Sequence, residues 1–241
     1  METRTALVTG AAQGLGREFA VALAGHGCRV AGLDLVAQPE TAEQVPGYVE
    51  LIADVTDEAQ IQGALARVIE EFGTLHILVN NAGVYPSCPF EEITPGEWRR
   101  IMRVNLEAPF LLTRAVLPCL KAAGWGRVVN IVSAAVLTAP PTMVPYVASK
   151  MGLIGFTRSL AAALGPYGIT VNAIAPSMVR TATAERTVGA DGGFEHVRDG
   201  QVVPRTQEPS DLISTLLYVV DEGSGFLTGQ TLNVSGGSAF L

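Results

Sequence analysis

Short apolar runs alternate along the chain with longer segments in which apolar residues recur at helical spacing. Residues 57–72 place Ile61, Leu65, Val68 and Phe72 on one side of a helix, whereas Val-Val-Asn-Ile-Val over 128–132 shows no alternation, as in a strand buried on both faces. The same signs predict strands at 4–9, 29–33, 48–53, 77–79, 127–132, 170–175 and 230–234, and helices at 15–26, 57–72, 97–121, 146–164 and 209–220. Strands separated by helices favour right-handed crossovers, so we expect a doubly wound parallel sheet in a three-layer α/β/α domain.

Residues 182–208 lack clear periodicity and carry mixed charges together with Gly189, Gly192 and Gly193. Ordinary surface irregularity would explain this pattern. However, a loop of this length in a compact domain is usually functional. We therefore expect one domain over residues 1–241, with a mobile substrate loop at about 182–208.

Composition and charge narrow the class of protein. A hydrophobic fraction of 48% and a charged fraction of 16% exclude a disordered chain. The net charge of −7 argues against a nucleic-acid or anionic-membrane partner, because both need a positive surface. Cys28, Cys88 and Cys119 are odd in number and widely spaced, so we expect three buried free thiols rather than disulfides or a metal site.

Two uncharged stretches, residues 128–149 and 159–179, resemble membrane spans in length. Pro140, Pro141 and Pro145 interrupt the first, and Gly165, Pro166 and Gly168 interrupt the second. A spanning helix tolerates few such breaks, so we expect buried elements of a soluble protein. The first expected strand begins within a few residues of Met1, and we accordingly expect no signal peptide and a cytoplasmic location.

A glycine-rich turn, with Gly10, Gly14 and Gly16, joins the first expected strand to the first expected helix. Glycines allow the backbone to approach a ligand closely, and the helix start offers free N–H groups to a diphosphate. Asp34 follows at the end of the second strand, where a carboxylate can accept hydrogen bonds from ribose hydroxyls and would repel a 2′-phosphate. A solvated turn carboxylate is the plainer explanation, but this position favours NAD(H) over NADP(H).

Tyr146 and Lys150 share one face of an expected helix. An ammonium nearby favours the phenolate, so Tyr146 could exchange a proton with an alcohol or ketone. Ser133 follows a strand at the edge where ligands bind in such sheets, and its hydroxyl can donate to a substrate oxygen. Asn105 is a poor helix former within a long helix. It is either a surface or capping residue, or it interrupts the helix and opens a water site near Lys150.

Together these residues resemble the short-chain dehydrogenase/reductase family of the compact, single-domain type. The matches run in the family's order over nearly the whole chain: Thr9-Gly10-xxx-Gly14-x-Gly16, Asp54, Asn80-Asn81-Ala82-Gly83, Asn105, Ser133, Tyr146-xxx-Lys150, Asn172-Ala173-Ile174-Ala175-Pro176 and Leu227-Thr228-Gly229-Gln230-Thr231. The resemblance implies a Rossmann-type fold, hydride transfer between a nicotinamide cofactor and an alcohol, and a homotetramer formed through residues 97–121 and 146–164.

The resemblance also implies roles for single residues. Tyr146 would be the general acid/base, Ser133 would orient the substrate oxygen, Lys150 would lower the pKa of Tyr146 and bind the nicotinamide ribose, and Asn105 would hold a water. The residues expected to bind the cofactor are Gly10, Gln13, Gly14, Leu15, Gly16, Asp34, Asp54, Val55, Asn81, Ala82, Gly83, Tyr146, Lys150, Pro176, Val179 and Thr181. Ser177 departs from the family, which often has glycine there, and so puts the local backbone geometry in doubt. Val132 and Ser235 are milder departures.

The expected substrate wall is mostly apolar, which favours an uncharged, hydrophobic secondary alcohol and its ketone. Its residues are Tyr85, Pro86, Val136, Leu137, Met143, Ser177 and Met178, with Ser133 and Tyr146 at the substrate oxygen. Residues 81–86, 124–127 and 175–183 are similar to bacterial NAD-dependent 1-phenylethanol dehydrogenases. An anionic group on the substrate remains an open alternative, because four arginines lie close to this wall in the sequence: Arg180, Arg186, Arg198 and Arg205.

Two alternatives remain. The first is reduction of a 3-oxoacyl thioester on acyl carrier protein, for which Arg99, Arg100 and Arg103 offer a basic patch, although a solvated helix face explains them as well. The second is a nucleotide-sensing binding protein that keeps the fold without catalysis. A pure binder has no need for a base, its pKa-tuning lysine and a substrate-orienting hydroxyl together, which favours an enzyme.

Overall fold

The computed structural model describes residues 3–188 and 192–240. Within them, seven parallel strands form one sheet in the order β3-β2-β1-β4-β5-β6-β7. The strands are β1 (Thr5–Thr9), β2 (Arg29–Asp34), β3 (Val49–Ile52), β4 (Ile77–Asn80), β5 (Gly126–Ile131), β6 (Ile169–Pro176) and β7 (Thr231–Val234). The expected doubly wound parallel sheet is confirmed, and its strand order reverses between β1 and β4, where ligands bind in such folds.

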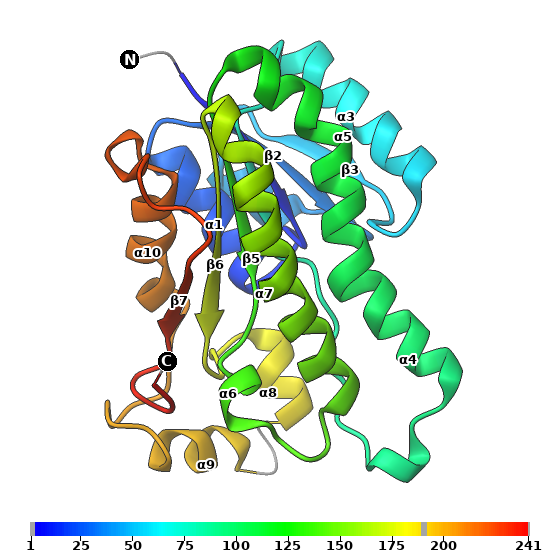
Figure 1. Cartoon of the computed structure of the whole chain (residues 1–241), viewed down its shortest axis with the longest axis vertical. Helices are drawn as coiled ribbons and strands as arrows, with labels where there is room; N and C mark the ends of the chain where they lie inside the picture. Colours follow the sequence, from blue (N-terminus) through cyan, green and yellow to red (C-terminus); the bar gives the residue numbers. More distant parts are fainter. Residues whose placement is uncertain (1–2, 189–191, 241) are drawn as a thin grey trace.

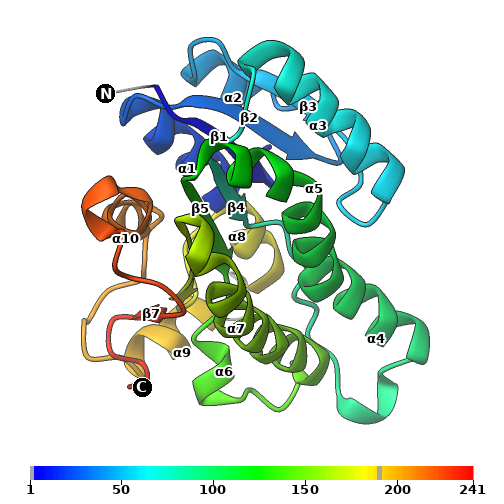
Figure 2. The same ribbon diagram turned by 45° about the horizontal axis from the view of Figure 1, so that its top comes forward.

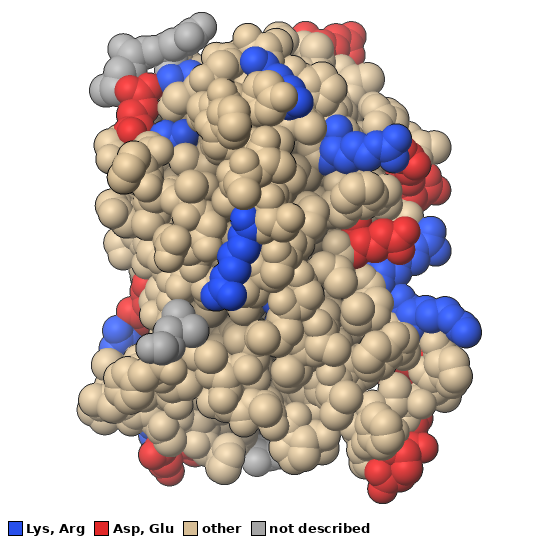
Figure 3. Space-filling model, viewed as in Figure 1, with Lys and Arg blue, Asp and Glu red and all other residues tan. Residues whose placement is uncertain are grey.

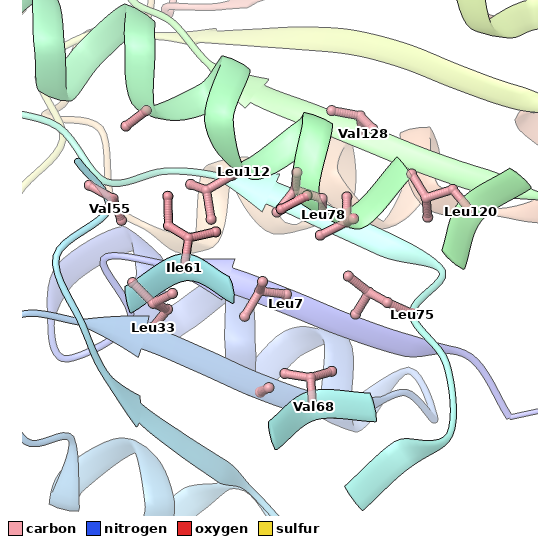
Figure 4. Packing of buried hydrophobic residues seen from close by; sticks show 14 of the residues in the cluster. Leu7, Leu33, Val55, Ile61, Val68, Leu75, Leu78, Leu112, Leu120 and Val128 are labelled. Atoms are coloured by element: carbon pink, nitrogen blue, oxygen red, sulfur yellow. The ribbon is translucent and has the colours of Figure 1, made fainter. Parts of the chain in front are cut away.

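Helices cover both faces of the sheet (Figures 1 and 2). Residues of α3 (Glu58–Phe72), α5 (Ala108–Ala123) and α7 (Val144–Leu164) join one buried cluster, and those of α1 (Gly14–Gly25) and α10 (Ser210–Val220) join another. Figure 4 shows Val68 of α3 and Leu112 of α5 packed over Leu7 and Leu33 of the sheet. The sheet is therefore buried on both sides, which explains why β1, β4, β5 and β6 consist only of buried residues.

The expected helix over 97–121 is longer and is interrupted. It begins with α4 (Pro95–Met102), where the Thr94 hydroxyl caps the first turn, and continues through a π-helical turn at Arg103–Glu107 into α5. Several short elements also escaped the sequence pattern, among them α2 (Pro39–Gln44), α6 (Ala135–Thr138) and the 3-10 turns at Phe90–Glu92, Gly165–Tyr167 and Glu222–Ser224. Helices of this length show too few turns for a periodic signal.

The segment over 182–208, which we expected to be a mobile substrate loop, contains two helices. This segment forms α8 (Ala182–Val188) and α9 (Gly193–Asp199), and Gly189 lies outside the described residues. Figure 1 shows both helices beyond the arrowheads of β6 and β7. Phe194 of α9 is 4% exposed and lies 5.0 Å from the Arg180 guanidinium, so tertiary packing holds a segment that has no amphipathic pattern of its own. The mobility of this segment stays a prediction.

The three cysteines are free thiols, but the expectation that they are buried is wrong, because each is partly exposed. Burial and neighbouring carboxylates nevertheless leave the pKa of Cys88 above its ordinary value, and burial raises the pKa of Cys28 and Cys119. No helix in residues 3–188 and 192–240 is long and apolar enough to cross a membrane. The two uncharged stretches instead form β5 and β6 and the helices that flank them.

Candidate active site

The glycine-rich turn lies between the end of β1 and the start of α1. Gly10 and Gly14 have φ values of +68° and +57°, and a Cβ on Gly16 would lie 2.0 Å from the Gly10 carbonyl oxygen. Only glycine fits these conditions without strain. Gln13 precedes α1 without a side-chain hydrogen bond to the helix, so the N–H groups that begin α1 remain available to a ligand anion.

The Asp34 carboxylate lies against this turn. Its Oδ2 accepts a hydrogen bond from the Ala12 N–H at 2.9 Å, and Oδ1 faces the Val36 N–H at 3.4 Å. The Ala53 N–H donates to the Asp34 carbonyl at 2.9 Å, which brings the start of the Asp54 loop beside it. Asp34 is thus placed as the sequence predicts, at the carboxyl edge of the sheet and next to the glycine-rich turn.

The loop after β4 packs against the residues that lead into this turn, whereas no hydrogen bond of the described residues joins the loop after β3 to it. The Thr9 hydroxyl accepts hydrogen bonds from the N–H groups of Asn81 and Ala82, both at 3.0 Å, and Asn81 Nδ2 donates to the Thr9 carbonyl at 2.8 Å. The Asp54 carboxylate is used locally, since the Thr56 N–H and hydroxyl both donate to it at 2.8 Å. Val55 is buried in the core, so only its backbone could meet a bound adenine.

Thr181, Pro176 and Val179 complete the group expected to bind the cofactor. Pro176 ends β6, and Val179 turns its side chain into the core. Thr181 lies directly before α8, where its hydroxyl accepts the Ala184 N–H at 3.1 Å, and its methyl carbon lies 3.4 Å from the Cβ position of Gly14. The chain after β6 therefore passes over the glycine-rich turn, which no sequence spacing predicts.

Lys150 is buried at the first turns of α7, with 3% of its surface exposed. Its ammonium donates to the Ile131 carbonyl at 2.7 Å and lies 5.8 Å from the centre of the Tyr146 ring. A Cβ on Gly83 would lie 3.6 Å from Lys150 Nζ, so the loop after β4 packs beside this ammonium. Burial lowers the pKa of Lys150 to about 8.

The direction of the Tyr146 pKa differs from the sequence expectation. Burial raises the pKa of Tyr146 above its ordinary value; a hydrogen bond with Ser133 opposes this shift, and the nearby Tyr85 adds to it. The Lys150 ammonium lies 5.8 Å from the centre of the ring, and the net direction of the pKa remains upward. The hydrogen bond places the Ser133 hydroxyl beside the phenol, while the pKa of the phenol in the protein chain alone is raised rather than lowered.

Asn105 occupies the π-helical turn and is fully buried, so the interpretation as a surface or capping residue is wrong. Its Oδ1 accepts the Val84 N–H at 2.9 Å, and its Nδ2 donates to the Val84 carbonyl at 2.8 Å and to the Ser149 hydroxyl at 3.1 Å. The Ser149 hydroxyl in turn donates to the Tyr146 carbonyl at 2.7 Å. Asn105 thus ties the loop after β4 to α7.

Ser149 is a residue that the sequence reasoning missed. Serine is common at many helix positions, so its place directly before Lys150 is only a weak signal in the sequence. The long-range bond to Asn105, 44 residues away, is what gives it a place in the site.

The expected substrate wall stands beside Tyr146. The rings of Tyr85 and Tyr146 meet edge to face with centres 6.4 Å apart. Hydrogen bonds from Ser87 and Cys88 to Thr142 join the loop after β4 to the loop before α7, where Met143 precedes the first helical residue. Two loops that carry predicted wall residues therefore form one rim.

The departure at Ser177 leaves the backbone unstrained. Among the described residues, Ala139 is the non-glycine residue with positive φ, and Ser177 is not affected. The Ser177 N–H donates to Gln207 Oε1 at 2.8 Å, and Gln207 Nε2 donates to the Val234 carbonyl at 2.7 Å. Gln207, which no sequence pattern marks, therefore holds the turn after β6 against the end of β7.

Comparison with known proteins agrees with this geometry. The family model described as short chain dehydrogenase matches residues 4–191. The chain belongs to the short-chain dehydrogenase/reductase family, and it is an oxidoreductase that acts on CH–OH groups with a nicotinamide cofactor. This result favours an enzyme over the nucleotide-sensing binding protein.

Three relatives illustrate the range of the family. The chain is 36% identical to (2S)-[(R)-hydroxy(phenyl)methyl]succinyl-CoA dehydrogenase subunit BbsD of Thauera aromatica, over 100% of this chain and 98% of that protein. It is 38% identical to trans-4-hydroxycyclohexanecarboxylate dehydrogenase of Sinomonas cyclohexanicum, over 97% and 92% of the two chains. The crystal structure of 3-ketoacyl-(acyl-carrier-protein) reductase from Brucella melitensis complexed with NADH superposes with a TM-score of 0.91 at 28% identity, covering 98% of each chain.

Proposed function

We propose that the protein transfers a hydride between NAD(H) and a hydrophobic secondary alcohol or its ketone. The observation that carries the proposal is the convergence, at one edge of the sheet, of Tyr146, Ser133 and Lys150 with the glycine-rich turn and Asp34. The names of the relatives from Thauera and Sinomonas both describe an alcohol carbon joined to or within a ring, which supports a ring at the alcohol carbon; both names also include an acid group, so the uncharged character of the substrate rests on the apolar wall alone.

The glycine-rich turn fits a dinucleotide. The amides that begin α1 have no capping side chain, and the Asp34 carboxylate beside them suits ribose hydroxyls and opposes a 2′-phosphate. A bound oxidised dinucleotide would supply the hydride acceptor and a positive charge. That charge, added to the Lys150 ammonium, would counter the burial that raises the pKa of Tyr146.

The chain's own residues would then handle the substrate proton. Ser133 orients the substrate oxygen, and the Tyr146 phenolate removes the hydroxyl proton during oxidation or returns it during reduction. Lys150 stabilises the phenolate, and Asn105 with Ser149 fixes the helix turn that carries Tyr146. Positioning and proton transfer together account for the rate enhancement.

A second candidate substrate is a 3-oxoacyl thioester, which the similarity to the Brucella melitensis reductase favours. In the basic patch expected for an acidic carrier protein, Arg103 donates to the Thr56 carbonyl and keeps its charge. Hydrophobic secondary alcohols remain the better supported class.

We also propose a homotetramer that acts in the cytoplasm. A groove of about 660 Å³ runs along α4, α5 and α7 and is lined by Trp98, Arg99, Met102, Arg103, Leu106, Glu107, Phe110 and Phe156. None of these residues belongs to the expected cofactor or substrate site, and Arg99 and Arg103 are part of the candidate basic patch. Phe110 and Met151 are 46% and 51% exposed, and the face of the molecule over α7 carries few charges (Figure 3), as a subunit interface requires.

The function is tested by following the absorbance of the reduced nicotinamide with aryl, alicyclic and aliphatic secondary alcohols, polyols and hydroxyacyl thioesters, each with NAD⁺ and NADP⁺. We expect the highest kcat/KM with NAD⁺ and an aryl or alicyclic alcohol. Tyr146→Phe should lower kcat by roughly 10²- to 10⁴-fold, the usual contribution of a general acid/base, with NADH affinity unchanged. Substantial turnover by this variant, or a preference for polyols or thioesters, would reject the proposal.

A further inference from the structure

The chain after β6 carries four arginines, and three of them are neutralised by carboxylates. Their ion pairs are Arg180 with Glu185 and Glu208, both at 3.3 Å, Arg198 with Asp199 at 2.9 Å and Arg205 with Asp211 at 2.6 Å. These three arginines therefore stabilise the segment itself and contribute little free positive charge to a ligand site.

Arg186, on α8, differs from the other three. Its guanidinium nitrogen Nη2 lies 3.4 Å from Gln13 Oε1 and 3.2 Å from the Thr183 hydroxyl, and both of these partners are neutral. Within residues 3–188 and 192–240, no carboxylate forms an ion pair with it. The Arg186 side chain is exposed, and no carboxylate of the described residues pairs with its charge.

Two independent contacts place this charge at the glycine-rich turn. Arg186 reaches Gln13, the residue directly before α1 and 173 positions away in the sequence. Thr181, at the start of α8, packs its methyl group 3.4 Å from the Cβ position of Gly14. The helix α8 therefore lies across the start of α1.

The electrostatics of this juxtaposition call for an anion. The first turn of α1 carries a partial positive charge, contains no acidic residue and has no side-chain cap. The Arg186 guanidinium beside this turn adds a second positive charge, and the two positive charges repel each other. The neighbouring Asp34 carboxylate is engaged by the Ala12 and Val36 N–H groups. A guanidinium and free amides together match the oxygens of a phosphate group.

We propose that Arg186 binds the diphosphate of the dinucleotide from the α8 side, opposite the amides of the glycine-rich turn. The inference rests on the proposed function, since it requires a dinucleotide at this turn. Gln13 holds the guanidinium in place through its side-chain oxygen. Arg186 is therefore a cofactor-binding residue that a glycine motif, read locally, does not include.

The experiment measures binding of NADH, NADPH and ADP-ribose to the wild type and to Arg186→Met, Arg186→Lys and Arg198→Met by calorimetry. The Arg198 variant is the matched control, because that arginine lies on the adjacent helix α9 and pairs with Asp199. We expect Arg186→Met to raise the Kd of NADH and of ADP-ribose by about three- to tenfold, given an exposed charge contact, with Arg186→Lys intermediate and Arg198→Met unchanged. The Arg186→Met loss should shrink as salt is added.

Three results would overturn the inference. They are an unchanged Kd for NADH in Arg186→Met, an equal loss in Arg198→Met, and a loss confined to NADPH, which would assign the arginine to a 2′-phosphate instead. Equal unfolding midpoints for all variants establish that folding is intact. Failure of the wild type to bind NADH and ADP-ribose would instead refute the proposed function.

Discussion

Lys150 provides the most discriminating test, because its buried ammonium is expected to lower the stability of the native state and to be required for turnover. At 3% exposure, the ammonium is held in the native state at a cost, and its pKa falls from the usual 10.5 to about 8. A tenfold change in proton affinity corresponds to about 1.4 kcal/mol, so the charged form destabilises the native state by roughly 3 kcal/mol at neutral pH. We therefore expect Lys150→Met to stabilise the protein while it abolishes turnover.

The net gain in stability from Lys150→Met is smaller than the cost of burying the charge. The variant loses the 2.7 Å hydrogen bond from Lys150 to the Ile131 carbonyl, which is worth about 1 kcal/mol. The expected stabilisation at pH 7 is then roughly 2 kcal/mol, or an increase in Tm of about 4–8 °C for a domain of this size.

The dependence of stability on pH shows whether the buried charge destabilises the native state. Below pH 8 both the native and the unfolded chain bind the proton, so the native state carries the full cost. Between about pH 8 and 10.5 the unfolded chain keeps the proton that the native state has released, so the wild type gains stability as the pH rises. The advantage of Lys150→Met should accordingly be largest near pH 7 and shrink steadily above pH 8.

Urea unfolding of the wild type and the variant at several pH values, without nucleotide, measures this difference. Lys121→Met is the control, because Lys121 is exposed on α5 with its ammonium over the Tyr167 ring. A Lys150→Met variant that is less stable at pH 7, or whose stability difference is the same at neutral and alkaline pH, would refute the electrostatic reasoning.

Three further variants test the rest of the site. Asp34→Ala should raise the Kd of NADH by about tenfold, the value of a lost charge-assisted hydrogen bond, and affect NADPH less; equal losses in calorimetry would contradict the ribose role. Gly16→Ala should destabilise the protein by about 3 kcal/mol in urea, because its Cβ overlaps the Gly10 carbonyl, whereas Gly25→Ala, with open space, should stabilise it slightly. Ser149→Ala should lower the unfolding free energy by about 1–2 kcal/mol and reduce kcat more than it raises KM for the alcohol; a change in KM alone would contradict its positioning role.

The local sequence was sufficient for the order of strands and helices, for the glycine-rich turn and for the shared face of Tyr146 and Lys150. Each of these features depends on hydrophobic periodicity or on residues a few positions apart, which the chain displays directly. The predicted strand ends lie within one residue of their true positions, because sheet pairing extends or trims a strand without changing its pattern.

Only the tertiary structure decided how distant segments meet. Asn105 was recognisable as an unusual helix residue, yet its bonds to Val84 and Ser149, and the contact of Arg186 with Gln13, join positions that no local pattern relates. The pKa directions of Tyr146 and Lys150 likewise depend on how completely the folded chain removes them from water. Desolvation and long-range contacts are properties of packing, and packing exists only once the whole sheet and its helices are assembled.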